Sequence, residues 1–263
     1  MDATATRKCL RDWIPEKRRL MSDGYSAIYE YYDLFTGNVD YGRRADFIDS
    51  FFRRYGRPEI VLDAGCGTGT LMSILAGKGY DMIGVDSSEE MLSLAMEKNP
   101  GQLLLCQDIT ELDLYGTVQG IVCMQDTLNH LSDGEEVTDA VSRMSLFLES
   151  GCLFIFDLNS VYKHREVLAD NAFVYESEDA MLVWQNSTDE DLRVSMTLDL
   201  FEKTGKDLYR RETGYIEEIF IGDETLNRAL EKAGLELLGK YDGDTFGEVC
   251  ETTQRILYIT RKR

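Results

Sequence analysis

The stretch Val61-Leu62-Asp63-Ala64-Gly65-Cys66-Gly67-Thr68-Gly69 decides the fold, because in it an apolar strand runs into a glycine-rich turn. Glycine lets the backbone adopt positive φ and approach a ligand closely. Helical spacing follows at Leu71, Ile74 and Leu75, so the turn opens a helix whose first N–H groups can hold an anionic group such as a carboxylate. The spacing is G-x-G-x-G, not the G-x-G-x-x-G of dinucleotide-binding enzymes.

Short apolar runs recur between Ile60 and Phe156, at residues 60–62, 82–85, 103–106, 121–124 and 153–156. Continuous apolarity favours strands that are covered on both faces, as in a parallel sheet. The intervening segments are predicted helices, two of them opened by the S-x-x-E capping boxes Ser87–Glu90 and Ser132–Glu135, with Gly151 ending the second. The order of strands and helices therefore predicts an α/β fold with a doubly wound, mostly parallel sheet.

The pattern changes between about residues 173 and 220, where alternating stretches are separated by polar turns. Such alternation predicts antiparallel strands, hence a small sheet inserted after the fifth strand. A helix and two strands, near residues 235–241 and 255–260, then complete a seven-stranded main sheet. We expect three parts: an N-terminal helical segment, a main domain and an insertion, at residues 1–58, at 59–172 with 221–263, and at 173–220.

Composition excludes several classes of function. The chain has 263 residues and a net charge of -20, which would repel a nucleic acid backbone. Its six cysteines show no metal-ligand spacing, so we expect reduced thiols and no metal site. Neither a membrane span nor a secretion signal is evident, which predicts a cytoplasmic protein. Basic and apolar residues between positions 7 and 19 predict an amphipathic helix.

Two acidic residues follow neighbouring strands. Asp86 closes the second strand, where a carboxylate can accept hydrogen bonds from both hydroxyls of a ribose. Asp108, within Gln107-Asp108-Ile109, ends the third strand, where it can accept from an adenine amino group while Ile109 covers the ring. Taken alone, either aspartate could have a purely structural role and bind no ligand, and for Asp86 that role is a helix cap.

Together with the glycine turn, these elements resemble the class I S-adenosylmethionine-dependent methyltransferases from the strand before Asp63 through Asn159, which implies a Rossmann-like methyltransferase fold. The resemblance implies S-adenosyl-L-methionine as cofactor and S-adenosyl-L-homocysteine as product. It places Asp63 toward the ammonium group of the cofactor and Gln125 beneath the sulfonium. The residues implied to line the cofactor pocket are Asp63, Gly65, Cys66, Gly67, Asp86, Ser87, Met91, Gln107, Asp108, Ile109 and Gln125.

A narrower resemblance covers nearly the whole chain. The patterns Tyr25-x6-Tyr32-Asp33, Val39-Asp40-Tyr41, Asp126-Thr127-Leu128-Asn129-His130 and Phe156-Asp157-Leu158-Asn159-Ser160 are similar to small bacterial methyltransferases related to glycine and amino-sugar N-methyltransferases. The resemblance implies that Tyr25, Tyr32 and Tyr41 form a lid over the cofactor and that the inserted sheet covers the acceptor. Departures from the family pattern, at Arg44, His130, Ile216 and Ile219, leave the acceptor open.

Methyl transfer from a sulfonium releases a neutral group, so positioning is the main task of the protein. A general base is needed only for a protonated acceptor. His130 is the candidate base, because it follows the fourth strand at the ligand-binding edge of the sheet, although a structural histidine is an equal alternative. Asp126, Asn129 and Asn159 are candidates to orient the acceptor.

The sequence thus predicts a methyltransferase, monomeric or homodimeric, that acts on a small molecule, with an amine as one candidate acceptor. The alternatives are an S-adenosylmethionine-binding protein without turnover and, with less support, a nicotinamide-dependent oxidoreductase.

Overall fold

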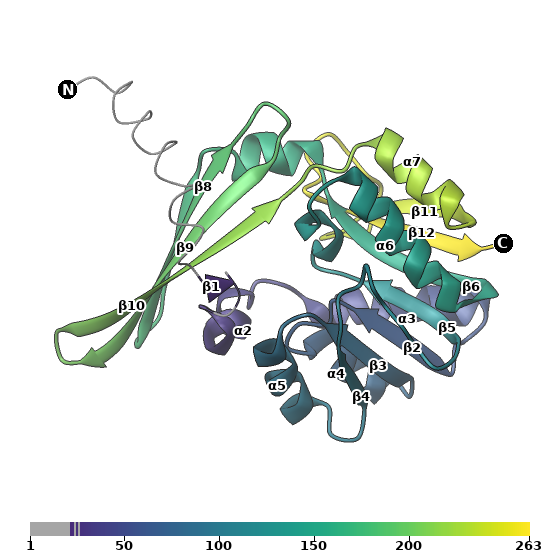
Figure 1. Ribbon diagram of the computed structural model, residues 1–263, viewed down its shortest axis with the longest axis horizontal. Coiled ribbons are helices and arrows are strands. Elements are labelled where there is room, and N and C mark those ends of the chain that lie inside the picture. Colours follow the sequence, from purple (N-terminus) through teal and green to yellow (C-terminus); the bar gives the residue numbers. More distant parts are fainter. Residues whose placement is uncertain (1–21, 24, 26) are drawn as a thin grey trace.

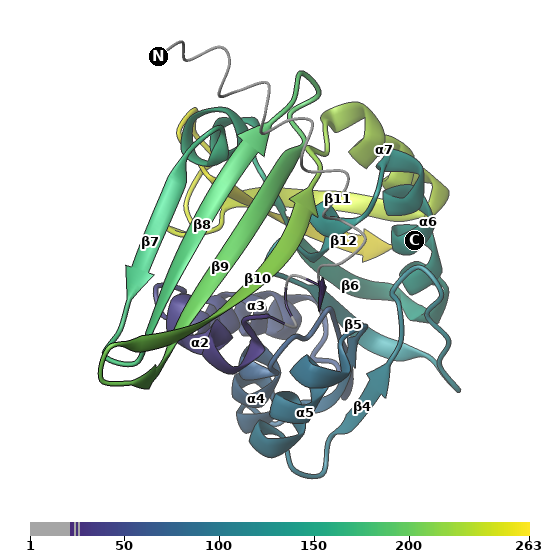
Figure 2. The same cartoon turned by 60° about the vertical axis from the view of Figure 1, so that its left-hand side comes forward.

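The computed structural model describes residues 22–23, 25 and 27–263, so the predicted helix around residues 7–19 lies outside the described residues. Two sheets lie side by side in it (Figures 1 and 2). The large sheet has the strand order β11-β12-β6-β5-β2-β3-β4. Its strands are β2 (Ile60–Ala64), β3 (Asp81–Asp86), β4 (Leu103–Cys106), β5 (Val118–Cys123), β6 (Leu148–Asn159), β11 (Leu235–Asp242) and β12 (Arg255–Lys262).

The strands from β2 to β6 are parallel, and β12 runs antiparallel to both β6 and β11. The chain moves outward from β2 to β4 and then returns to β5 on the other side of β2. The strand order therefore reverses between β2 and β5, and ligands of open α/β sheets bind at the carboxyl ends of strands at such a point. The predicted doubly wound, mostly parallel seven-stranded sheet is confirmed.

Helices cover both faces of the large sheet (Figure 1). Their bounds are α3 (Tyr41–Tyr55), α4 (Thr70–Gly77), α5 (Glu89–Lys98), α6 (Gly134–Phe147) and α7 (Asp223–Lys232). Val61 packs in one core with α3 and α4, while the next residue, Leu62, packs in the other core with α6 and α7. This alternation explains the unbroken apolarity of the strand, because both of its faces are buried.

The insertion forms a second sheet, as predicted. Its antiparallel strands are β7 (Ala172–Glu176), β8 (Ala180–Thr188), β9 (Val194–Gly205) and β10 (Leu208–Glu218), and β1 (Ser22–Asp23) adds a short parallel pairing to β10. Short helical segments complete the described chain: η1 (Tyr29–Tyr31), α2 (Tyr32–Phe35), η2 (Thr127–His130) and η3 (Lys163–Leu168). No helix in the described ranges has the length and apolarity needed to cross a bilayer.

The described part of the predicted N-terminal segment, residues 1–58, packs in two different places. Ala27 and Ile28 pack with the inserted sheet, together with the ring of Phe35. Helix α3 instead packs Ile48 and Phe52 into the core of the large sheet. Only the part before α3 therefore covers the insertion, because the buried face of α3 belongs to the main domain.

Both predicted capping boxes begin one residue later than expected. Ser88 caps α5 by accepting the Met91 N–H (3.2 Å), and Asp133 caps α6. In each case the residue just before the helix has the extended backbone that an N-cap requires. The expectation for Gly151 is wrong, since α6 already ends at Phe147 and Gly151 (φ 84°) lies within β6.

The Ser88→Ala variant should lower the free energy of unfolding by about 1 kcal/mol, because the Met91 N–H loses its cap. Ser87→Ala, at the residue first expected to cap the helix, should change it little. Urea denaturation of both variants without ligand measures the difference. Equal losses in the two variants would contradict the assigned cap.

Candidate functional site

The glycine turn forms the wall of a cavity of about 340 Å³ at the carboxyl ends of β2 and β3, here called the turn cavity. A Cβ at Gly65 (φ 74°) would lie 2.4 Å from the Thr127 side chain, whereas one at Gly67 (φ 52°) would meet nothing within 4 Å. Glycine at position 65 is therefore required for packing against η2, and the Gly67 backbone is left uncovered for a ligand.

Asp86 shapes this turn as well as lining the cavity. Its Oδ2 accepts the Gly67 N–H (2.8 Å) and its Oδ1 accepts the Ser88 N–H (3.0 Å). The carboxylate thus fixes the turn relative to the start of α5, while Ser88 serves as the N-cap of that helix.

Asp63 is a buried acceptor beneath the turn. Its side chain is 2% exposed, and its Oδ2 has no hydrogen-bond partner. Burial, reinforced by the negative charge of Asp86, raises the pKa of Asp63 to about 7. An unpaired buried carboxylate is costly unless a donor or a cation reaches it.

The far end of the turn cavity is lined by five further residues that were predicted to bind the cofactor. Ser87, Gln107 and Asp108 lie there with the buried side chains of Met91 and Ile109. Asp108 uses Oδ1 to accept from the N–H and hydroxyl of Thr110 (2.8 and 2.7 Å), while the Gln107 amide pairs with the backbone of Asp113.

Besides Asp63 beneath the turn, two predicted residues, Cys66 and Tyr41, do not line the turn cavity. The Cys66 thiol packs toward β3, where a Cβ at Gly84 would lie 3.0 Å from its sulfur. Burial raises the pKa of that thiol above its ordinary value. Tyr41, in the first turn of α3, lines a separate cavity beside Thr70 and Lys98. Both departures follow from tertiary packing that sequence spacing does not show.

A second cavity, of about 590 Å³, lies between the main domain and the inserted sheet, and we call it the insertion cavity. Both cavities are lined by Tyr25, Tyr32, Gln125 and Ile216, which therefore form their junction. The rings of Tyr25 and Tyr32 meet edge to face at 5.8 Å, and burial raises the pKa of both phenols. The Oε1 atom of Gln125 is buried without a hydrogen-bond partner.

The buried carboxylate of Asp157 holds the backbone at this junction. It accepts the N–H groups of Gln125 (3.0 Å) and Asp126 (2.7 Å), two consecutive non-glycine residues with positive φ (60° and 57°). It also binds Arg44 at 2.8 Å and Arg255 at 3.0 Å. Such backbone strain persists only where surrounding contacts enforce it. Sequence reasoning assigned Asp157 no role, and it treated Arg44 only as a departure from a family pattern.

Asp126 lies within this network. Its Oδ2 accepts from Arg255 Nη2 (2.7 Å) and Asn159 Nδ2 (3.0 Å), and Lys163 Nζ lies at 3.3 Å. Burial alone would raise the pKa of Asp126, but the positive charges of Arg255 and Lys163 outweigh burial and hold it well below its usual range. Asp126 is therefore a fixed anion.

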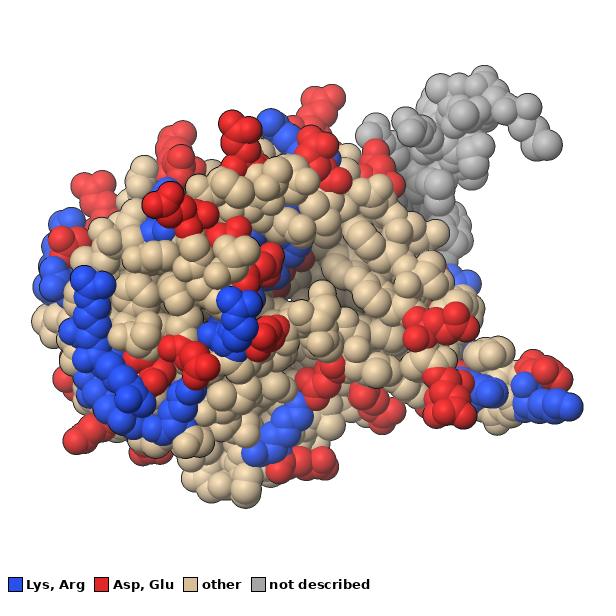
Figure 3. All heavy atoms as spheres, turned by 180° about the vertical axis from the view of Figure 1, so that it is seen from behind, with Lys and Arg blue, Asp and Glu red and all other residues tan. Residues whose placement is uncertain are grey.

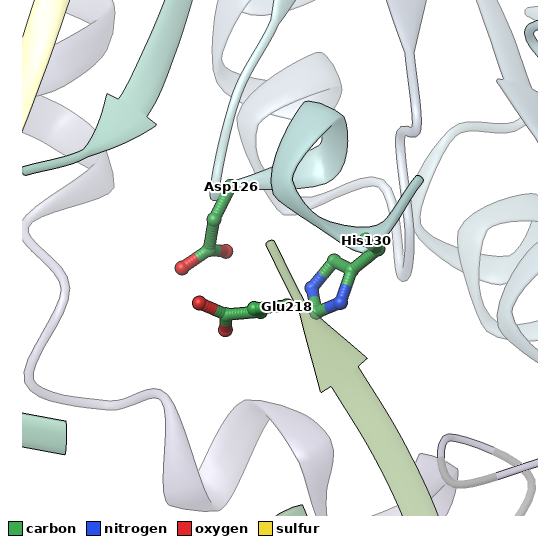
Figure 4. Close-up of side chains that lie close together, drawn as sticks. All are labelled: Asp126, His130 and Glu218. Carbon is green, nitrogen blue, oxygen red and sulfur yellow. The ribbon is translucent and has the colours of Figure 1, made fainter. Parts of the chain in front are cut away.

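Glu218 faces Asp126 and His130 (Figure 4). It lies at the end of β10, is 4% exposed, lines the insertion cavity and accepts from Asn159 Nδ2 at 2.6 Å. Burial and the negative charge of Asp126 raise its pKa above the ordinary value. Sequence reasoning missed Glu218, although Gly214, Ile216 and Glu218 share the buried face of the alternating strand.

The hydrogen bonds of His130 define its neutral tautomer. Nδ1 lies 3.1 Å from the Glu217 carbonyl oxygen, which can only accept, so Nδ1 carries the proton. Nε2 then accepts from the Tyr25 hydroxyl at 2.9 Å. Asp126, His130 and Glu218 lie close enough to hold a metal ion. However, Arg255 and Lys163 already neutralise Asp126 and both His130 nitrogens are engaged, so we assign no metal here.

The structure corrects the prediction that Asn129 orients an acceptor. Asn129 is fully buried and lines neither cavity. Its Nδ2 donates to the Ile219 carbonyl (2.8 Å) and its Oδ1 accepts the Asn159 N–H (3.0 Å). Both polar atoms of its amide are used to connect the end of β10 with β6. This connection positions Glu218, the last residue of β10.

Comparison with known proteins identifies the family. The model of a family described as "Methyltransferase domain" matches residues 61–151. A putative methyltransferase of Geobacillus sp. (strain WCH70) is 27% identical over 90% of this chain and 99% of its own length. The dTDP-3-amino-3,6-dideoxy-alpha-D-glucopyranose N,N-dimethyltransferase of Streptomyces fradiae is 29% identical over 47% of this chain and 50% of its own length.

A solved structure extends the similarity to the fold of nearly the whole chain. It is an S-adenosylmethionine-dependent methyltransferase from Clostridium acetobutylicum ATCC 824, 32% identical, with a TM-score of 0.81 over 88% of this chain and 96% of that one. Sequence, fold and the glycine turn agree, and the chain belongs to the S-adenosylmethionine-dependent methyltransferases.

Proposed function

We propose that this methyltransferase methylates the nitrogen of a small-molecule amine. The observation that carries the proposal is Glu218, a buried carboxylate with a raised pKa that lines the insertion cavity near its junction with the turn cavity. An amine arrives largely protonated at neutral pH and must lose a proton before its lone pair can react. The N,N-dimethyltransferase activity named for the Streptomyces relative supports the same acceptor atom.

In this proposal the turn cavity holds S-adenosylmethionine, which supplies an electrophilic methyl group on a sulfonium. The uncovered Gly67 backbone and Asp86 bind the ribose side, with Asp108 and Ile109 toward the adenine. The buried, unpaired Oδ2 of Asp63 fits a site for a positively charged ligand, because an ammonium group nearby would stabilise its ionised form.

The side chains at the junction have separate roles toward the acceptor: one removes a proton and another orients the nitrogen. The carboxylate of Glu218 takes a proton from the ammonium group of the acceptor, and Asp126 remains ionised throughout because Arg255 holds it. The unpaired Oε1 of Gln125 accepts an N–H of the amine, which orients the nitrogen lone pair toward the turn cavity.

His130 becomes a positioning residue in this scheme, in place of the base suggested by its position in the sequence. Its Nε2 lone pair is already used by the Tyr25 hydroxyl, so it has no lone pair to receive a substrate proton directly. Through that bond it holds the Tyr25 ring at the junction between the two cavities.

Glu218→Gln should lower kcat about 100-fold to 10,000-fold with a panel of amines, because a positioned base contributes that much. In the unaltered enzyme, activity should rise as pH increases through the raised pKa of Glu218, and this limb should vanish in the variant. Formation of S-adenosylhomocysteine measures both effects. Glu212→Gln, on the same strand but outside both cavities, is the matched control.

Stability separates a lost base from a lost fold. Because the pKa of Glu218 is raised in the folded state, the stability that this group contributes at low pH is lost as pH rises through that pKa. Glutamine removes this dependence, so Glu218→Gln should be no less stable at neutral pH. Full activity in the variant would contradict the proposal, and S-adenosylhomocysteine binding without turnover of any amine would favour a binding protein.

Asp86→Ala should weaken S-adenosylhomocysteine binding about 10-fold to 100-fold, because a charged acceptor is lost from the ribose side and from the Gly67 N–H. Asp81→Ala, at the opposite end of the same strand β3, should leave the affinity unchanged. Isothermal titration calorimetry measures both variants. Equal affinities would remove Asp86 from the cofactor site.

A further inference from the structure

We propose that the acceptor is an apolar monoamine, with one amino group on an aromatic or branched hydrocarbon body and no anionic group. This inference rests on the proposed function and names the substrate class for the same site. It departs from the nucleotide-linked amino sugar in the name of the Streptomyces fradiae relative.

The first observation is the wall of the insertion cavity. Leu182, Met196 and Leu198 of the inserted sheet are at most 4% exposed and line the cavity with Ile28 and Leu168. These side chains come from the N-terminal segment, from the insertion and, for Leu168, from η3 of the main domain. A volume of about 590 Å³ lies in the range of pockets that enclose drug-sized ligands. The wall therefore offers apolar burial to the body of the acceptor.

Aromatic rings extend this wall. Phe173 of β7 and Trp184 of β8 line the cavity with their ring centroids 5.3 Å apart, and the Trp184 indole N–H donates to Asn186. Because that donor is already used, the indole presents its apolar surface and no unsatisfied polar group. Such a pair favours an aromatic or branched hydrocarbon over a sugar, whose hydroxyls would lose their hydrogen bonds to water.

The second observation is that most cations of the lining are already paired. Arg44 binds Asp157, and Arg255 binds both Asp157 and Asp126. Lys163 lies 3.3 Å from Asp126 and donates to the Asn159 side-chain oxygen. A diphosphate would have to break these buried pairs to find a partner, which is strongly unfavourable.

The remaining lining cation lies at the exposed end of the cavity. The guanidinium of Arg43 is 5.2 Å from the centre of the Phe246 ring, and the exposed acids Asp40 and Asp244 line the same end. Seen from behind, the surface of the molecule is hollowed near its centre, with acidic and basic side chains around the hollow (Figure 3). One arginine beside two carboxylates does not form a diphosphate site.

At the buried end of the cavity, the charged groups favour a cationic ligand over an anionic one. Asp126 and Glu218 face each other there, and no lysine or arginine among the described residues forms an ion pair with Glu218. Burial and the negative charge of Asp126 raise the pKa of Glu218. Arg255 and Lys163 compensate the charge of Asp126, so the ionised Glu218 is the group that attracts an ammonium here and repels a carboxylate or phosphate. The cavity thus combines a buried carboxylate with an apolar wall.

Binding and turnover test the inference on the intact protein saturated with S-adenosylhomocysteine. Trp184 fluorescence should change with 2-phenylethylamine, and it should not change with 3-phenylpropionate, which carries a carboxylate in place of the amine, or with a dTDP-linked amino sugar. Trp184→Phe should abolish the change, since the other tryptophan of the chain is Trp13. With S-adenosylmethionine present, 2-phenylethylamine should have a higher kcat/KM than the dTDP-linked amino sugar.

A matched pair of variants on β7 tests the wall. Phe173→Ala should raise KM for 2-phenylethylamine about tenfold, or about 1.4 kcal/mol, with kcat and S-adenosylhomocysteine affinity unchanged. Val174→Ala should have no effect, because Val174 is 62% exposed and lies outside both cavities. An unchanged KM in Phe173→Ala would overturn the role of the wall.

The outcomes separate this inference from the proposed function. Preferred binding and turnover of the dTDP-linked amino sugar would overturn the inference and leave N-methylation standing. Fluorescence binding of 2-phenylethylamine without turnover of any amine would overturn N-methylation, and the acceptor assignment with it, and would leave the cavity as a binding site for an apolar amine. Binding of neither amine would overturn the inference by itself.

Discussion

The carboxylate of Asp157 is the constraint on which the rest of the site depends. It ties together the backbone N–H groups of Gln125 and Asp126, helix α3 through Arg44 and strand β12 through Arg255. Removing one member of a buried ion pair leaves the other charge uncompensated and typically costs about 3–5 kcal/mol. The strained turn after β5, and with it the junction of the two cavities, exists because these contacts enforce it.

This cluster explains why the neighbouring carboxyl groups of Asp126 and Glu218 differ in their tendency to hold a proton. Arg255 serves both Asp157 and Asp126, so Asp126 stays ionised. Glu218 faces the same place, but none of the lysines or arginines that the structure describes forms an ion pair with it. Burial and the negative charge of Asp126 favour its neutral form. A pair of titratable groups whose environments separate their pKa values is a common arrangement for acid and base roles. Asn159 bridges both carboxylates and keeps them in one geometry.

The inserted sheet and the N-terminal segment complete the site from the other side. They share a core of their own, a single buried cluster that includes Ala27, Ile28, Met196 and Leu198. This core is separate from the two cores of the large sheet. The proposed acceptor side can therefore vary in shape and polarity while the proposed cofactor side, built on β2 and β3, keeps its architecture.

Local sequence patterns determined the α/β fold, the glycine turn, and the positions of Asp86, Asp108 and Ile109 along the turn cavity. These features depend on residues close in the chain: a strand, a turn that needs positive φ at Gly65 and Gly67, and the residues that follow each strand. Only the tertiary structure showed that Cys66 and Tyr41 turn away from that cavity and that Asn129 is consumed in packing. It also brought together Arg44, Asp157, Glu218 and Arg255, from four different elements. The physical reason is that burial, charge and hydrogen-bond partners at these positions come from contacts between distant segments, and no periodicity within one segment reports them.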